Sequence, residues 1–84
     1  MINTIFTGKR ALPRRPPVKS VLTPRENEVL RWVAEGKSAR EIGEILAITK
    51  RTVDEHVQTA IRKLGAMNRT NAVAIALRDG LIKL

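Results

Sequence analysis

The residues with the most informative chemistry lie between positions 51 and 62. At about 100° per residue, a helix through this stretch has a polar face made of Arg51, Asp54, Glu55, Gln58, Thr59 and Arg62. Gln58 can pair bidentately with adenine, and Arg51 or Arg62 can bind guanine or a phosphate. The carboxylates of Asp54 and Glu55 repel phosphates, but they can accept from cytosine N4 or hold a neighbouring arginine. This face could contact base edges, although a solvated surface helix can show a similar mixture of charges.

The opposite face of the same stretch is apolar. Its residues, in the three-and-four spacing of an amphipathic helix, are Val53, Val57, Ala60, Ile61 and Leu64. The hydroxyl of Thr49 can cap the first turn, and Gly65 is a typical signal for the last. The spacing therefore predicts a helix over residues 50–64.

A shorter amphipathic segment precedes this helix, and the tight turn 47–49 separates the two. Its apolar residues are Ala39, Ile42, Ile45 and Leu46. Gly43 lowers helix propensity, which suggests that a neighbouring helix approaches closely there. A short helix, a tight turn and a longer helix form a helix-turn-helix, here at about 42–61, whose second helix lies in the DNA major groove.

The start of the shorter helix has a capping-box pattern, Ser38-Ala39-Arg40-Glu41. Lys37 and Ser38 lie at this helix N-terminus, where free N–H groups favour a phosphate. The alternative is a plain cap beside a solvated lysine.

Thr23-Pro24-Arg25-Glu26 is another capping box, and it begins a first helix that should end near Gly36. The apolar side of this helix carries Val29, Leu30 and Val33, with Trp32 at its edge as a packing residue. The pattern predicts a supporting helix.

A fourth helix can be capped by Asn68 and should end near residue 79. Val73 and Leu77 share one face, which should complete the core, whereas Ile75 points almost the opposite way beside Ala72. A short helix that is apolar on two sides usually packs on two sides. We therefore predict an all-α, four-helix bundle with a dimer contact through this helix; the alternative is an exposed Ile75.

The composition supports one small folded unit. The chain has 84 residues, no cysteine and a net charge of +8, of which +5 lies in residues 1–20. Residues 1–20 are predicted to be a basic, proline-containing arm or linker, and residues 21–84 the folded domain.

The excess of basic over acidic residues favours a nucleic-acid partner. The chain has only two aromatic residues, which is too few for a protein that binds single strands by stacking bases on exposed rings. No apolar run is long enough to span a bilayer, and the first residues do not form a signal peptide. We therefore expect a cytoplasmic protein without membrane contact.

Catalysis is not expected. A catalytic triad would have to combine His56 with Ser20 or Ser38 and with Asp54 or Asp79. Asp54 and His56 lie two residues apart on one helix and point to different faces, which suits no triad. We expect no enzyme activity, no metal site and no cofactor.

Dispersed motifs give a specific resemblance. They are Leu22-Thr23-Pro24-Arg25-Glu26, Glu28-Val29-Leu30, Glu35-Gly36-Lys37-Ser38, Glu41-Ile42, Ile45-Leu46, Arg51-Thr52-Val53, His56-Val57, Lys63-Leu64, Asn68-Arg69-Thr70 and Ala72-Val73. Over about residues 20–84 the chain resembles the LuxR/GerE-type DNA-binding domain of bacterial transcription regulators, and Asn68-Arg69-Thr70 looks closest to the quorum-sensing branch. The resemblance implies a dimer on an inverted repeat in promoter DNA.

The resemblance also implies roles for particular residues. It implies base contacts by Asp54, Glu55 and Gln58, to which the chemistry of the polar face adds Arg62. The implied contacts to the DNA backbone are Lys37, Ser38, Lys50, Arg51, Thr52 and Lys63, and we add the cap residue Thr49. The implied dimer contacts are Ala72, Ile75 and Ala76. RNA polymerase or a full-length regulator are possible protein partners, and the bound protein is expected at the nucleoid.

The chain departs from the family pattern in two respects, and two other readings remain open. Asp54 and Glu55 stand where some relatives have basic or apolar residues, so the resemblance implies no particular target sequence. Such regulators usually carry a sensor or receiver domain, and none fits in this length. The open readings are a promoter-binding helix-turn-helix like that of sigma factors, and an interaction module that pairs with full-length regulators and blocks them.

Overall fold

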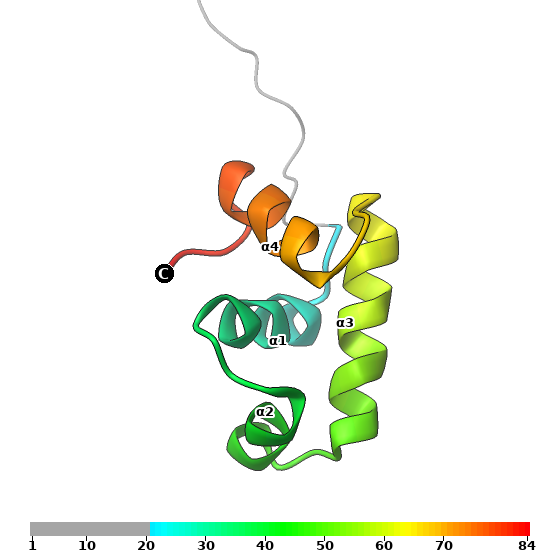
Figure 1. The fold of residues 1–84 in the computed structure, drawn as a ribbon, viewed down its shortest axis with the longest axis vertical. Helices are drawn as coiled ribbons and strands as arrows, with labels where there is room; N and C mark the ends of the chain where they lie inside the picture. The colour runs from blue at the N-terminus through cyan, green and yellow to red at the C-terminus, as the bar shows by residue number, and fades with distance from the viewer. Residues whose placement is uncertain (1–20) are drawn as a thin grey trace, which may run out of the picture.

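The computed structural model describes residues 21–84, and the predicted basic arm lies outside the described residues. This part of the chain forms four helices and no strand: α1 (Pro24–Ala34), α2 (Ala39–Leu46), α3 (Lys50–Leu64) and α4 (Arg69–Arg78). In Figure 1, α3 runs along one side of the domain, and α2, α1 and α4 follow one another along its length. The prediction of an all-α helix-turn-helix fold is confirmed.

Side-chain caps fix where α1 and α2 begin. The Thr23 hydroxyl accepts from the backbone N–H of Glu26 at 3.1 Å, and the Glu26 carboxylate accepts from the Thr23 N–H at 3.0 Å. Ser38 and Glu41 make the same reciprocal pair at 3.1 and 2.8 Å. Both predicted capping boxes are confirmed, and each satisfies N–H groups that the helix itself leaves without partners.

The two later helices begin with single caps. The Thr49 hydroxyl accepts from the Thr52 N–H at 3.1 Å, and the Asn68 side chain accepts from the Asn71 N–H at 2.8 Å. Gly65 ends α3 at a φ of 64°, a left-handed conformation that glycine adopts without steric cost. The predicted caps of both helices are therefore present.

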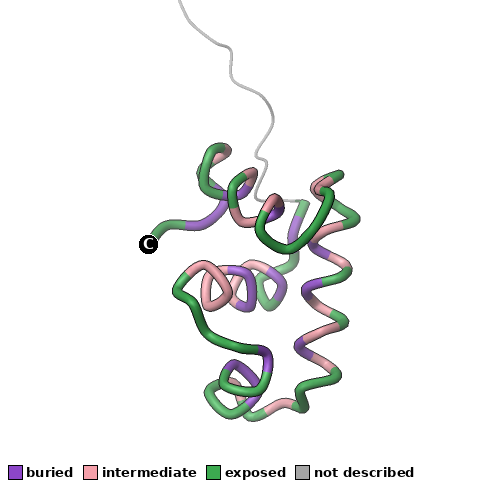
Figure 2. The backbone as a smooth tube through the Cα atoms, viewed as in Figure 1, coloured by how far each residue is buried: buried purple, intermediate pink, exposed green. Residues whose placement is uncertain are grey.

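Helix α3 contributes to both halves of the core. One buried cluster joins α1, α3, α4 and the C-terminal segment: Leu22, Leu30, Ala60, Ala72, Ala76, Leu81 and Ile82. The other joins α1, α2 and α3: Val29, Ala39, Ile42, Val53 and Val57. Trp32 packs against this second cluster, as predicted. Figure 2 shows the buried turns of α3 facing the other helices, so the opposite side of α3 is left to solvent.

The buried face of α4 differs from the prediction. Ala72 and Ala76 are 0% exposed, whereas Leu77 is 39% exposed. The two alanines are four residues apart and therefore share a face, and their small side chains let α4 approach the core closely. The prediction that Leu77 completes the core is wrong. The predicted dimer contacts of Ala72 and Ala76 are also wrong, because neither side chain reaches the surface; Ile75 is half-buried.

The apolar face of α2 is narrower than predicted. Ala39 and Ile42 are buried, Leu46 packs against the second cluster, and Ile45 is 46% exposed. Ile45 lies about 100° around the helix from Leu46, so it stands at the edge of the packed face. The placement of Ile45 on the packed face is therefore wrong.

The segment after α4 is part of the fold. Leu81 and Ile82 are buried in the first core cluster, and the Asn27 side-chain amide donates to the Leu81 carbonyl oxygen. The chain after α4 therefore returns to α1 and holds α4 in place.

Candidate nucleic-acid interface

The turn between α2 and α3 packs closely on α2. Ala47 ends α2 in the left-handed conformation, with a φ of 60°, and the Ile48 N–H donates to the Gly43 carbonyl at 3.0 Å. A Cβ atom added to Gly43 would lie 2.7 Å from the Ile48 carbonyl oxygen. Gly43 thus permits a close approach by the turn and by the start of α3, since Lys50 N would lie 3.4 Å from the added Cβ atom, and this contact fixes α3 relative to α2.

We expect Gly43→Ala to destabilise the domain by about 1–3 kcal/mol, because a backbone atom would have to move to admit the methyl group. Urea denaturation measures this loss. Ala47→Gly should have the opposite sign, a gain of up to about 1 kcal/mol, since glycine relieves the left-handed strain. Unchanged stability of Gly43→Ala would contradict the tight turn.

The outer side of α3 carries the predicted reading face, defined here as Arg51, Asp54, Glu55, Gln58, Thr59 and Arg62. These six side chains border one shallow, open hollow on the surface of α3. Asp54 and Thr59 are half-buried, and the other four are exposed. The structure therefore brings together all four residues predicted to contact bases, on the helix that the helix-turn-helix presents to solvent.

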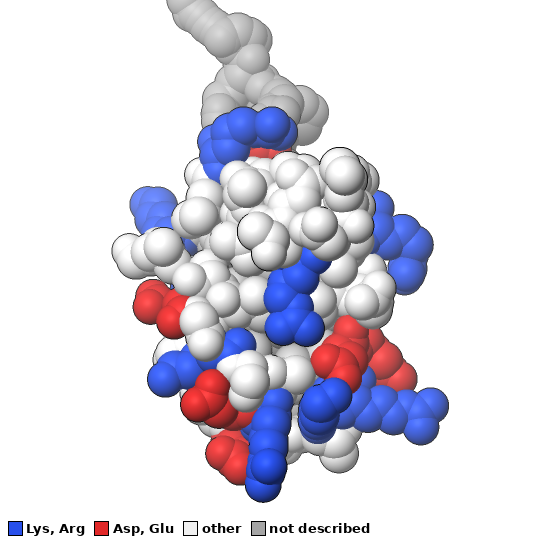
Figure 3. All heavy atoms as spheres, viewed as in Figure 1, with Lys and Arg blue, Asp and Glu red and all other residues white. Residues whose placement is uncertain are grey.

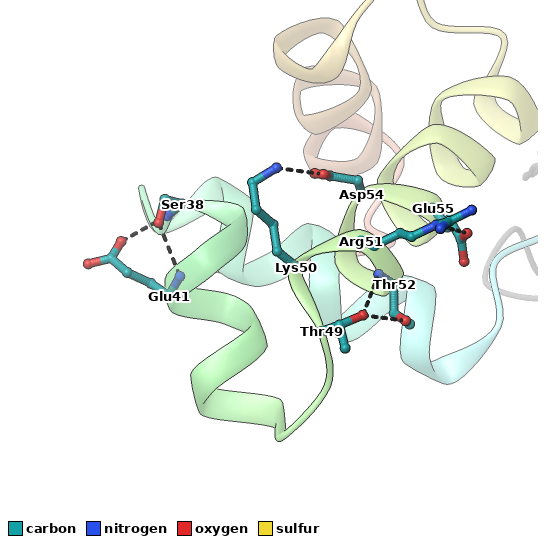
Figure 4. Close-up of polar contacts among 8 residues, drawn as sticks. All are labelled: Ser38, Glu41, Thr49, Lys50, Arg51, Thr52, Asp54 and Glu55. Carbon is teal, nitrogen blue, oxygen red and sulfur yellow. Dashed lines mark hydrogen bonds and ion pairs between the residues drawn. The ribbon is translucent and has the colours of Figure 1, made fainter.

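Two ion pairs cross the first turns of this face. Lys50 Nζ lies 2.9 Å from Asp54 Oδ2, and Arg51 Nε lies 3.5 Å from Glu55 Oε2. Figure 4 shows each cation directed at the carboxylate one turn further along α3. Figure 3 shows basic and acidic side chains next to each other at the lower right, where α3 begins. Lys50 and Arg51, two of the cations predicted to bind the DNA backbone, are thus paired within the protein.

Polar side chains flank these pairs. The Thr49 and Thr52 hydroxyl groups lie 2.9 Å apart, and Arg62 Nη2 donates to the Thr59 hydroxyl at 3.4 Å. Thr49 and Thr52 lie at the N-terminus of α3, the end at which a helix favours anions.

The N-terminus of α2 forms a separate part of the predicted contact surface. Lys37 and Ser38 are exposed there. The Ser38 N–H donates to the Glu41 carboxylate, which lowers the pKa of that carboxyl below its ordinary value. The protein's own carboxylate therefore occupies one N–H that a phosphate could have used, and the predicted phosphate contacts of Lys37 and Ser38 stay predictions.

Lys63 lies away from the reading face. Its Nζ is 2.8 Å from Glu26 Oε1, and the Glu26 side chain is only 9% exposed. Burial raises the pKa of Glu26, but hydrogen bonds from Lys63 and from the Thr23 N–H outweigh it, and the net pKa is lowered. The ammonium predicted to contact DNA therefore joins α3 to the start of α1.

We expect Glu26→Gln to lower stability at neutral pH by about 1 kcal/mol, since it removes a charge-assisted hydrogen bond. Because the folded-state pKa lies below the ordinary value of 4.5, the contribution of the ionised carboxylate is fully present above that value. It is lost as pH falls through the lowered pKa, so the difference between the two proteins should shrink in acid. Urea denaturation across this pH range measures it. Glu44→Gln, in an exposed pair with Arg40, is the control, and a pH-independent difference for Glu26→Gln would contradict the assignment.

The sequence analysis allowed Asp54 or Glu55 to hold a neighbouring arginine, and the pair of Arg51 with Glu55 is such a contact; the ion pairs of Lys50 and Lys63 were not identified. The pairs of Lys50 with Asp54 and of Arg51 with Glu55 follow the i, i+4 rule for helices, so their spacing could have indicated them. The pair of Lys63 with Glu26 joins residues 37 apart, and no local signal indicates it. Between residues 21 and 84, no three His, Asp or Glu side chains could hold a metal ion, and no helix could cross a membrane.

Comparison with known proteins identifies the family. The sequence profile of the family described as "Bacterial regulatory proteins, luxR family" matches residues 20–76, which comprise α1, α2, α3 and most of α4. The chain belongs to the LuxR family. A solved structure of the transcription factor GerE superposes with a TM-score of 0.73 at 33% identity, over 75% of this chain and 94% of GerE. Escherichia coli SdiA gives a TM-score of 0.70 at 41% identity, over 75% of this chain and 26% of SdiA.

Relatives of this LuxR-family chain are transcription regulators. It is 58% identical to the transcriptional activator protein BjaR1 of Bradyrhizobium diazoefficiens over 88% of this chain and 31% of BjaR1. It is also 58% identical to the quorum sensing-dependent transcriptional regulator RpaR of Rhodopseudomonas palustris, over 89% of this chain and 31% of RpaR. The chain thus spans about a third of the length of these curated relatives. It is a DNA-binding domain of the LuxR type.

Proposed function

We propose that this domain binds double-stranded DNA in a sequence-specific manner, with α3 in the major groove of a promoter inverted repeat. The observation that carries the proposal is the exposed reading face on the second helix of a closely packed helix-turn-helix. The names of BjaR1 and RpaR support a role in transcription control, and that of RpaR supports a role in quorum sensing. We propose that the protein acts in the bacterial cytoplasm, at the nucleoid when bound to DNA.

The proposed contacts divide by chemistry. Asp54, Glu55, Gln58 and Arg62 would meet base edges, since side chains on the exposed face of a recognition helix reach the groove floor. The proposed contacts to the DNA backbone are Lys37, Ser38, Thr49, Lys50, Arg51 and Thr52. Lys63 is left out because its ammonium is held by Glu26. Phosphate contacts orient the domain, and base contacts select the sequence.

The proposed dimer contact uses the outer surface of α4. The half-buried Ile75 and the 39% exposed Leu77 leave apolar area on two sides of this helix. A symmetric dimer presents two recognition helices, which suits an inverted repeat with half-sites about one helical turn apart.

Selection from a randomised duplex pool at near-physiological salt tests the proposal. Sequencing of the retained DNA should show an inverted repeat. Retention without enrichment would mean that the chain binds phosphates regardless of sequence, and the proposed function would then be wrong.

A second candidate is an interaction module that pairs with full-length regulators through α4 and blocks them; RNA polymerase would be a further possible protein partner. The observation that favours this candidate is the neutralisation of Lys50 and Arg51 by Asp54 and Glu55. It predicts heterodimers in size-exclusion chromatography together with weak DNA binding that does not depend on sequence.

A further inference from the structure

The first turns of α3 carry a balanced set of charges. Lys50 and Arg51 are paired with Asp54 and Glu55, so four of the charges nearest the turn cancel. The first turn of α3 contains no acidic residue, and the positive end of the helix dipole disfavours cations there. Without the two carboxylates, these cations would be drawn to the nearest external anion, which on a DNA surface is a phosphate.

The pairs are suited to exchange partners. All four side chains are at least 39% exposed, and the Arg51 side chain is 89% exposed. Exposed pairs of this kind are weak, so a phosphate can replace a carboxylate on the cation when the carboxylate has another donor. Each cation therefore keeps its carboxylate only where the DNA offers that carboxylate no hydrogen-bond donor.

We propose that Asp54 and Glu55 are specificity residues that keep Lys50 and Arg51 paired on non-target DNA and release them to phosphates on the target sequence. This inference rests on the proposed function and concerns the same face. On a target, amino groups at the edges of cytosine or adenine donate to the carboxylates, and the cations are freed.

A non-target sequence places guanine or thymine beside the carboxylates, with the amino group of the base pair on the opposite strand. The edges of guanine and thymine present O6, N7 and O4, none of which can donate to a carboxylate. The acids then keep their own cations, and their oxygens face base acceptors to which they cannot hydrogen-bond. Binding to such DNA loses two phosphate contacts, so the ratio of target to non-target affinity increases.

The double variant Asp54→Asn/Glu55→Gln tests the inference on a duplex of mixed sequence. The variant frees both cations, so the salt dependence of its binding should steepen by about 0.9 for each additional phosphate that the cations neutralise. Its affinity for this duplex should rise about tenfold for each of these phosphates near 0.1 M salt. The parent chain should show the steeper slope only on a duplex enriched from the random pool. Fluorescence anisotropy over a salt series gives both slopes.

The matched control is Glu35→Gln/Glu44→Gln, which changes the net charge equally on exposed residues outside the reading face. An equal change in slope for this control would show that total charge alone is responsible and would overturn the inference. So would an unchanged slope of the test variant with a native circular dichroism spectrum. The comparison on mixed-sequence DNA does not require a known target sequence. Its result is therefore independent of whether the parent chain selects an operator from the random pool.

Discussion

Gln58→Ala combined with Arg62→Ala should abolish sequence-specific DNA binding and leave the fold intact. Both side chains are exposed on the reading face, so their removal creates no cavity. A bidentate contact to a base contributes about 1–3 kcal/mol of discrimination. Loss of two such contacts should reduce affinity for the selected operator by about a hundredfold or more.

Electrophoretic mobility shift with the operator and a scrambled duplex measures this loss. Arg78→Ala is the control for the loss of one positive charge. Arg78 lies at the end of α4 and is not part of the reading face. This variant should leave the ratio of operator to scrambled affinity unchanged. If the double variant retains the parent's sequence preference, another surface reads the DNA, and the assignment of α3 is wrong.

Leu30→Ala should lower the free energy of unfolding of the domain by about 2–5 kcal/mol. Leu30 is 0% exposed and is one of the largest fully buried side chains in the described part of the chain. Truncation of a buried leucine costs about 2–5 kcal/mol, because it removes apolar contacts and leaves a cavity. A domain of this size has a total stability of only about 3–10 kcal/mol, so the loss takes much of it.

Urea denaturation followed by circular dichroism gives the free energy of unfolding. Leu84→Ala makes the same chemical change at a residue that is 72% exposed, and it should shift stability by no more than about 0.5 kcal/mol. A cost for Leu30→Ala as small as for this control would contradict the packing of the first core cluster.

The local parts of the fold could be predicted from the sequence. Each helix start depends on a hydroxyl, amide or carboxylate within three residues of the group that it caps, so Thr23, Ser38, Thr49 and Asn68 could be read directly. The polar and apolar sides of α3 could also be predicted, because fifteen residues are enough to show the helical spacing of its apolar side chains clearly. The composition of the reading face was therefore predictable, while its DNA contacts stay predictions.

The tertiary parts could not be predicted in the same way. Hydrophobicity alone favours Leu77 over Ala72 as a core residue, yet the close approach of α4 selects the alanine. Ile45 belongs to a helix of only eight residues, in which the edges of the apolar face are poorly defined. The partner of Lys63 lies on another helix. Each error concerns how one helix sits on another, which helical spacing alone does not determine.

The burial of Leu81 and Ile82 beside Leu22 and Leu30 bears on the order of events during synthesis. A ribosome makes the chain from its N-terminus, so α1 emerges long before the residues that cover it. Until the segment after α4 has left the ribosome, the inner surface of α1 lacks part of its cover. The shared cluster therefore closes late, and α3, which contributes Ala60 to it, gains full support only after Leu81 and Ile82 have been made.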